Sequence, residues 1–150
     1  MKHGEKAMEL FTQGYNCAQA VAVAFSDVTG LNEKDSARMV AGFGGGVGRL
    51  REVCGSVSGM VFVLSYLYGY DEPNPQAQKV LYEEVQGLAE QFRAQNGSIV
   101  CREILKNPPA DPAPSPRTAE YYAKRPCARM VYTAAQLLDA FLQEHPLEKL

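Results

Sequence analysis

The chain has 150 residues, 46% hydrophobic and 21% charged, with 15 basic and 17 acidic side chains and a formal net charge of -2. This length and composition predict one folded domain and exclude a disordered chain, and the charge balance gives no electrostatic basis for binding nucleic acid. The most apolar stretch, Val57 to Tyr68, is too short and interrupted for membrane insertion. The first eleven residues lack the apolar core of a signal peptide, so we expect a cytoplasmic protein.

Apolar residues recur at helical spacing through the first half of the chain and predict its elements in order. The expected helices run from 4 to 12, from 17 to 28, from 33 to the glycines at 42–48, and from 50 to 70. Asn16 and Asn32 are side chains that favour helix N-caps, and they stand directly before the second and third of these helices. The fourth helix is apolar on nearly every side, which is typical of a helix buried at the centre of a fold.

The second half continues the same pattern. The expected elements are a long amphipathic helix from 76 to 95, a short helix capped by Ser98 and reaching 105, a helical turn from 118 to 122, and a last helix from 127 to 144. Five prolines between Asn107 and Pro116 predict an extended surface loop, because proline fixes φ and lacks an amide hydrogen. We therefore predict an all-α single domain over residues 1–150, a compact bundle of about six to seven helices with a glycine-rich loop before a buried central helix.

The cysteines share one kind of position. There are four, none of them in a C-x-x-C pair: Cys17, Cys54, Cys101 and Cys127. Each falls in or near the first turn of a predicted helix, where free amides and the helix dipole lower the pKa of a thiol and favour the thiolate. Any one of them can equally be a small buried hydrophobe, but four placed alike predict a shared site that the fold assembles. The histidines, His3 and His145, are expected to be solvated, which argues against a triad hydrolase.

The glycine run from 42 to 48 has two interpretations. It lacks the full dinucleotide-binding pattern and follows no strand. We favour glycines that let the backbone pass close to a helix or a metal site, and the alternative is a loop of amides that binds an anion beside Arg49 and Arg51. The small residues after Cys54 either allow two helices to approach closely or leave room beside the sulfur. We assign contact with a bound cofactor to three glycines: Gly45, Gly46 and Gly55.

Three segments and two single cysteines together resemble the C_GCAxxG_C_C family of small redox-active proteins. The segments are Asn16–Val21 (NCAQAV), Gly42–Gly48 (GFGGGVG) and Cys54–Gly59 (CGSVSG), followed by Cys101 and Cys127. The resemblance covers residues 14 to 130, and its one visible departure is Ser56, which replaces the family's usual alanine and adds a hydroxyl near Cys54. The resemblance implies that the four cysteines are the functional set, without implying a particular reaction. A related module attached to haem proteins carries an iron–sulfur centre.

Three functions are compatible with such cysteines. The one we favour is a metal site formed by all four thiolates, either an iron–sulfur cluster that exchanges electrons with an unidentified redox partner or, alternatively, zinc. The second is thiol–disulfide chemistry, with Cys54 as an accessible nucleophile and Cys17 beside it. In the third, the protein is a non-enzymatic helical binding module without a cofactor, and its cysteines only pack.

Overall fold

Helices account for nearly all regular structure in the computed structural model, which describes residues 2–147. The α-helices of this part are α1 (His3–Thr12), α2 (Cys17–Ala24), α3 (Ser26–Thr29), α4 (Glu33–Met39), α5 (Gly55–Tyr68), α6 (Pro75–Asn96), α7 (Cys101–Ile104), α8 (Ala119–Lys124) and α9 (Cys127–Glu144). A 3₁₀ turn, η1 (Ala41–Phe43), follows α4. The only pairing of extended chain among these residues is one antiparallel bridge between Val53 and Val100. The predicted all-α class is confirmed.

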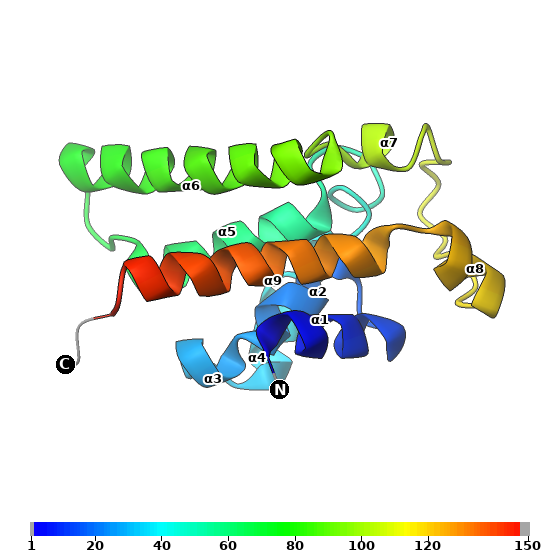
Figure 1. The fold of residues 1–150 in the computed structure, drawn as a ribbon, viewed down its shortest axis with the longest axis horizontal. Helices are drawn as coiled ribbons and strands as arrows, with labels where there is room; N and C mark the ends of the chain where they lie inside the picture. Colours follow the sequence, from blue (N-terminus) through cyan, green and yellow to red (C-terminus); the bar gives the residue numbers. More distant parts are fainter. Residues whose placement is uncertain (1, 148–150) are drawn as a thin grey trace.

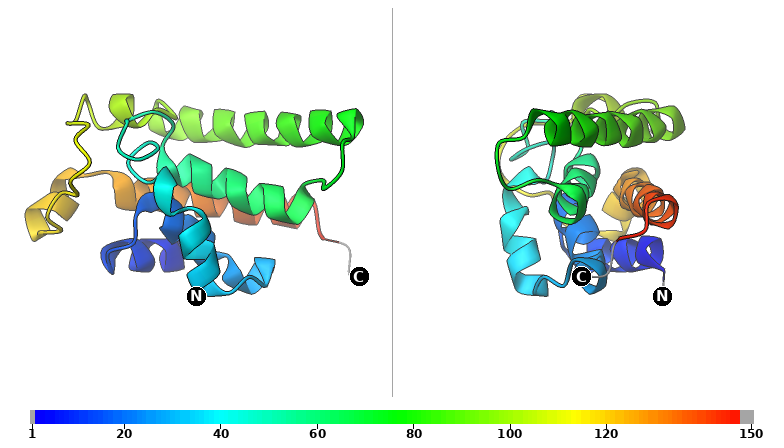
Figure 2. Two further views of the ribbon diagram at one scale, coloured as in Figure 1. Left: turned by 180° about the vertical axis from the view of Figure 1, so that it is seen from behind. Right: turned by 90° about the vertical axis from the view of Figure 1, so that its left-hand side faces the viewer.

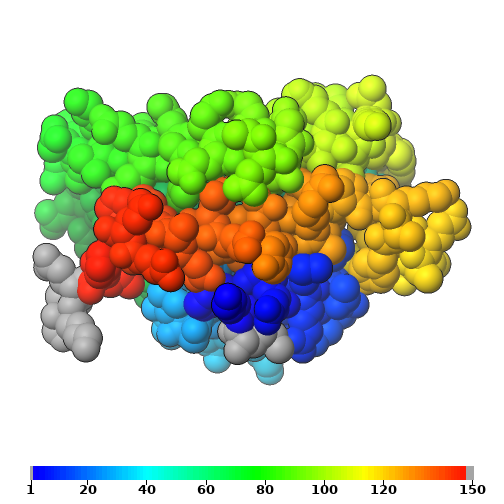
Figure 3. All heavy atoms as spheres, in the orientation of Figure 1, coloured from blue at the N-terminus to red at the C-terminus, as the bar shows by residue number. Residues whose placement is uncertain are grey.

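The helices stack in three layers (Figures 1 and 2). α6 forms one layer, α5 and α9 lie side by side beneath it, and α1 to α4 form the third. Figure 3 shows α9 as a band between α6 and α1 on one face of the molecule. The predicted central helix, α5, packs against α2, α6 and α9, and its inner face carries Val57, Met60, Val63 and Leu64. None of the helices within residues 2–147 is long and apolar enough to cross a membrane.

Asparagine and threonine side chains define several helix starts, as the sequence predicts. Asn16 accepts a hydrogen bond from the Gln19 amide at 2.9 Å while the Gln19 side chain accepts from the Asn16 amide, which completes a capping box on α2. Asn32 caps α4 in the same way through its side-chain oxygen, and Thr118 caps α8. These caps satisfy amides that have no partner inside the helix, so they fix where each helix begins.

Four details differ from the sequence-based expectation. The helix predicted over 17–28 is two helices, because the backbone leaves helical geometry at Phe25. The central helix begins at Gly55 rather than at residue 50, since residues 51–54 pair with another part of the chain. Val100, not Ser98, is the N-cap of α7, and the Ser98 hydroxyl instead accepts from the Val100 amide. The helices outnumber the six to seven expected because α3 is a separate piece and both short segments expected at 98–105 and 118–122 contain a helix, α7 and α8.

α2 and α5 cross at very close range. A β-carbon at Gly59 would lie 2.8 Å from the Ala18 carbonyl oxygen and 3.0 Å from the Val21 side chain. Almost every residue of α2 is buried, and alanines make up half of this eight-residue helix. Small residues on both helices therefore bring the start of α5 close to the start of α2, and with it Cys54 close to Cys17.

His3 is not solvated, which corrects the sequence-based expectation, whereas His145 is exposed as predicted. The two ring nitrogens of His3 lie 2.7 Å from a carboxylate oxygen of Asp139 and 2.9 Å from one of Asp27. The ring also stacks on Phe25, with centroids 4.1 Å apart. His3 therefore joins α1 to α3 and α9, three elements that no local sequence pattern connects.

Replacing His3 with alanine should lower the free energy of unfolding by about 1–2 kcal/mol, because two charge-assisted hydrogen bonds and a ring stack are lost at a half-buried position. Urea denaturation at pH 6 measures the change. The matched control is His145→Ala, whose contacts with Phe141 stay within one helix end and whose effect should be at most about 0.5 kcal/mol. Equal losses in the two variants would contradict a tertiary role for His3.

Candidate functional site

All four cysteines lie at the beginning of a helix, as predicted. Cys17, Cys101 and Cys127 are the first residues of α2, α7 and α9. Cys54 is the N-cap of α5. Because the amides of a first helical turn point toward the helix start, each of these cysteines lies next to N–H groups that no carbonyl of its own helix can satisfy.

The backbone joins Cys54 to Cys101. The Cys54 N–H donates to the Ile99 carbonyl at 2.7 Å, and the Cys101 N–H donates to the Glu52 carbonyl at 2.6 Å. These two bonds flank the antiparallel bridge, so residues 52–54 and 99–101 form a short backbone pairing. Figure 2 shows the loop before α5 beside α7, where this pairing lies. The pairing fixes the distance between two cysteines that are far apart in the sequence.

Glycines let the chain pass directly against two of the cysteines. A β-carbon at Gly55 would lie 2.4 Å from the Cys17 sulfur, and one at Gly46 would lie 2.7 Å from the Cys101 β-carbon. Burial raises the pKa of Cys17, and a hydrogen bond from the Gly45 backbone to this sulfur acts in the opposite direction. This close approach agrees with the favoured interpretation of the glycine run. Contact between these glycines and a cofactor stays a prediction.

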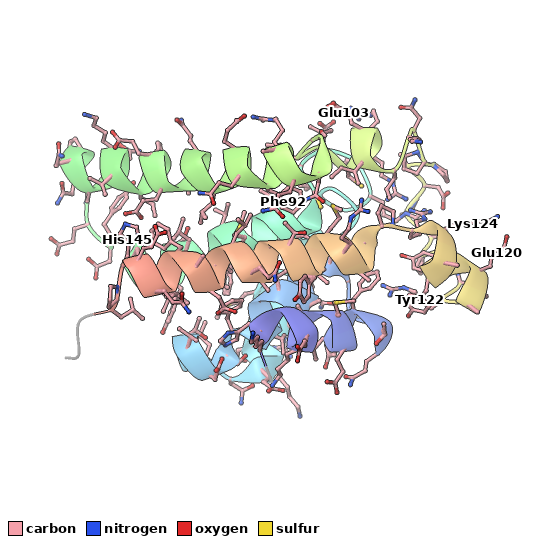
Figure 4. All side chains as sticks on the ribbon, viewed as in Figure 1. Phe92, Glu103, Glu120, Tyr122, Lys124 and His145 are labelled. Atoms are coloured by element: carbon pink, nitrogen blue, oxygen red, sulfur yellow. The ribbon has the colours of Figure 1, made fainter. Side chains whose placement is uncertain are left out.

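One cavity of about 400 Å³ has all four cysteines in its wall. The glycine loop contributes Gly44, Gly45 and Gly48, and the proline-rich segment contributes Pro112 and Pro114. The rest of the wall comes from one or two residues each of α1, α2, α5, α7, α8 and α9 and from the chain next to these helices. Figure 4 shows Tyr122 on the side of α8 that faces α1, whereas Glu120 and Lys124 point away. The fold therefore gathers the predicted cysteine set around a single space.

The loop between η1 and α5 has an unusual backbone. Five consecutive residues, 45–49, have positive φ values between 56° and 73°, and Arg51 follows with 63°. Two of the five, Val47 and Arg49, are not glycine, and for a β-branched residue such as Val47 this conformation is rare. Hydrogen bonds hold it, such as the one from the Gly48 N–H to the Gly42 carbonyl at 2.8 Å. Strained backbone of this kind is concentrated at functional sites.

Four arginines complete the cavity wall: Arg49, Arg51, Arg117 and Arg125. Arg51 is only 4% exposed, and it donates to the Cys101 sulfur at 3.6 Å and to the Pro109 carbonyl at 3.0 Å. Sequence reasoning singled out Arg49 and Arg51 beside the glycines but missed Arg117 and Arg125. The placement of Arg125 two residues before Cys127 is the one local signal that could have found it.

Burial overrides the helix amides at Cys17 and Cys54. Desolvation raises the pKa of Cys17 above its ordinary value, although amides of Gly45, Cys17 and Ala18 act in the opposite direction. The pKa of Cys54 is raised as well. Desolvation is the main cause, and the nearby Cys17 adds to it. The expected net lowering of these thiol pKa values is therefore wrong for the free protein. At neutral pH both groups are protonated thiols.

Cys127 behaves in the same way. Desolvation and the neighbouring Cys17 charge raise its pKa to about 12, although Arg125 and Arg117 lower it in part. Cys54 is also only 7% exposed, so its sulfur is not open to bulk solvent as the small residues after it had suggested. A partner or ligand reaches these sulfurs through the cavity rather than from the surface.

Two polar atoms in the cavity wall are buried and lack a hydrogen-bond partner within residues 2–147: the Ser56 hydroxyl and Nε of Arg49. The Ser56 hydroxyl lies near the Cys54 sulfur and lowers the pKa of that thiol, although the neutral pair has no hydrogen bond of normal geometry. Unpaired buried donors are costly, so both atoms point to a missing acceptor.

Among the described residues, no three His, Cys, Asp or Glu side chains are gathered closely enough to hold one metal ion. No curated protein and no solved structure matches the chain. Residues 15–141 match the family described as "Putative redox-active protein (C_GCAxxG_C_C)", which spans all four cysteines and the glycine run. The protein therefore belongs to the C_GCAxxG_C_C family of redox-active proteins.

Proposed function

We propose that the four cysteines form one redox centre, in which their thiolates hold an iron–sulfur cluster for electron transfer. The observation that carries this proposal is the single cavity with all four cysteines in its wall. Four thiolates are the ligand set that such clusters use, and a bound cluster would supply a one-electron couple at this position.

The chemistry of the cavity fits such a group. The donor set consists of thiols, and Gly55 and Gly46 let the backbone lie directly against Cys17 and Cys101 with no side chain between them. The Ser56 hydroxyl and the Arg49 Nε are buried donors without acceptors, and donors of this kind hydrogen-bond to ligating sulfurs and tune the potential of a centre. Zinc on the same four thiolates is the alternative. It would make a structural site rather than a redox one, and it would require the sulfurs to move closer together than they lie in this structure.

The protonation state of the thiols adds a testable consequence. Burial and mutual repulsion keep Cys17, Cys54 and Cys127 protonated in the free protein. Ligation requires thiolates, so loading the site must release protons to solvent. The arginines in the cavity wall then offset the negative charge that the thiolates carry.

Reconstitution under anaerobic conditions with iron and sulfide should give a brown protein with visible absorbance. Replacing any one of the four cysteines with serine should lower its iron content at least about tenfold, since even residues behind the ligands cost 10–100-fold in metal affinity. The control is Val57→Ala, which is buried in the first turns of α5 and destabilises the fold by about 1–2 kcal/mol without removing a sulfur. A colourless protein with four titratable thiols that takes up no iron would contradict the proposal.

A dithiol–disulfide couple between Cys17 and Cys54 is the second candidate. A β-carbon at Gly55, the residue after Cys54, would lie 2.4 Å from the Cys17 sulfur. Burial is the main cause of the raised Cys54 pKa, and Cys17 is the charged group that adds most to it. In this reaction the Cys54 thiol first loses its proton, and the resulting thiolate attacks a disulfide of a partner protein. One partner thiolate is expelled and takes up a proton. The Cys17 thiolate then attacks the mixed disulfide, so that a Cys17–Cys54 disulfide forms and the partner leaves as a dithiol.

Mass spectrometry across a series of thiol–disulfide buffers tests this second candidate. Reversible loss of two hydrogen atoms from the wild type, abolished in both Cys17→Ser and Cys54→Ser but retained in Cys127→Ser, supports it. This reversible couple in a wild-type protein that takes up no iron would favour the disulfide over the cluster.

A further inference from the structure

The charge of the cavity wall is one-sided. Its charged side chains are the four arginines named above, which we call the arginine cluster, and no Asp or Glu of residues 2–147 lines the same space. The chain as a whole has more acidic than basic residues, so this imbalance is local. Like charges held around one cavity repel each other, and a water-poor wall screens them weakly. Negative charge inside the cavity would relieve this repulsion.

Arg51 is a buried positive charge in this wall that has no carboxylate partner among the described residues. It is 4% exposed, yet within the described residues it forms no ion pair with a carboxylate. Its neighbours are the Pro109 carbonyl and the Cys101 sulfur, both weaker partners than a carboxylate for a guanidinium. A buried cation without an anion is strongly unfavourable, so Arg51 needs a further partner on the cavity side.

Arg117 and Arg125 share one aromatic ring. Their guanidinium carbons lie 5.1 Å and 5.3 Å from the centroid of the Tyr121 ring. Arg117 is held by backbone carbonyls, among them Phe11 at 3.0 Å, and Arg125 makes no side-chain hydrogen bond in the described part of the chain. In the loop before α5, the Nε of Arg49 is buried and lacks an acceptor. Guanidinium N–H groups thus face the cavity with hydrogen-bonding capacity to spare.

We infer that the arginine cluster binds a small oxyanion, a molecule that bears a phosphate, sulfate or carboxylate group, inside the cysteine-lined cavity. Planar guanidinium forks match pairs of anionic oxygens, which is why arginine recognises these groups. The cavity volume of about 400 Å³ lies in the range of small-molecule sites and exceeds what an inorganic ion alone requires. The left-handed loop carries Arg49 and Arg51 and gives them a rigid base. The inference does not require the cluster, although both would share this cavity and its Arg49 side chain.

Thermal unfolding of the full-length protein with increasing inorganic phosphate or sulfate tests the site, with sodium chloride at equal ionic strength as reference. We expect the melting temperature to rise saturably with the oxyanions and not with chloride, because only a ligand of the folded state stabilises it in this way. Isothermal titration gives the dissociation constants. Phenyl phosphate binding more tightly than phosphate would identify an organic ligand, and the reverse order a free inorganic ion, and either result supports the site.

Arg125→Gln should weaken phosphate binding at least about tenfold, as expected for loss of one charged hydrogen-bonding partner. Its matched control is Arg129→Gln, an exposed arginine one turn further along α9 that does not line the cavity and should leave the dissociation constant unchanged. Cys127→Ser, which removes a proposed ligand of the cluster, should still bind phosphate. The inference is overturned if neither oxyanion binds above the chloride reference, or if Arg125→Gln and Arg129→Gln lose affinity equally. Phosphate binding without iron uptake would refute only the proposed cluster, and iron uptake without oxyanion binding only this inference.

Discussion

Replacing Gly55 with alanine should lower the free energy of unfolding by about 3 kcal/mol and push Cys17 out of the cavity wall. The new methyl group would lie 2.4 Å from the Cys17 sulfur and 3.0 Å from the Phe43 carbonyl oxygen. The Phe43 carbonyl belongs to the backbone and cannot rotate away as a side chain can. The loss of stability should therefore be near the upper end of the range for overpacked core positions. Urea denaturation measures the loss of stability, and labelling of the thiols followed by mass spectrometry measures the exposure of Cys17.

Gly87→Ala is the matched control for this substitution. Gly87 lies within α6, and a β-carbon there would meet nothing within 4 Å. Alanine should stabilise the helix at this position by about 0.5–1 kcal/mol, because glycine loses more backbone freedom on folding. A Gly55→Ala protein as stable as the wild type, with Cys17 still protected, would show that the sulfur does not depend on the missing side chain.

The stability of the reduced, metal-free protein should fall steeply above pH 9. The pKa values of Cys17, Cys54 and Cys127 are raised in the folded state, that of Cys127 to about 12, whereas unfolded thiols ionise near their ordinary value of 9.0. Above pH 9 the unfolded chain therefore holds fewer protons than the folded one, and unfolding becomes more favourable as pH rises. Each of the three thiols contributes a slope of up to about 1.4 kcal/mol per pH unit.

Urea denaturation at pH 7, 9 and 10.5 in the presence of a chelator and a reductant measures this slope. The contribution of these thiols is fully present below pH 9 and is lost as the pH rises toward their folded-state pKa values. Cys127→Ala should reduce the slope by about one third, since one of three titrating groups is gone. A free energy of unfolding that stays constant from pH 8 to 10.5 would contradict buried, protonated thiols.

The helices were predictable because their signals are local. Asn16 and Asn32 announce the starts of α2 and α4, and the apolar stripe of the last helix gives its span from residue 127 to 144. The start of α5 was not predictable in this way. Leu50, Val53 and Cys54 are apolar and favour an extension of the helix, but backbone groups of residues 51–54 pair with residues 99–102. Such a long-range pairing leaves no periodic trace in the sequence.

The candidate site also has parts that local sequence signals predict and parts that depend on long-range contacts. Asn16 and Pro126 stand directly before Cys17 and Cys127, so these two helix starts were predictable. The exact starts at Cys54 and Cys101 depend on the long-range pairing of residues 52–54 with residues 99–101. Arg117 and Arg125 reach the cavity only because α8 folds back against α1, where the Tyr122 hydroxyl donates to the Thr12 carbonyl. The raised pKa values likewise depend on burial by the whole fold, which outweighs the amides that a sequence pattern reveals.

Because residues 52–54 pair with residues 99–101 through the backbone, the distance between Cys54 and Cys101 does not depend on the side chains of the residues that form the pairing. Its hydrogen bonds use only main-chain atoms, and Val53 is more than one third exposed. Point mutations at Val53 or Ile99 should therefore accumulate during evolution without altering the separation of Cys54 and Cys101. Proline at 102 is the exception, because the Arg102 N–H donates to the Arg51 carbonyl at 3.1 Å and proline has no hydrogen to replace it.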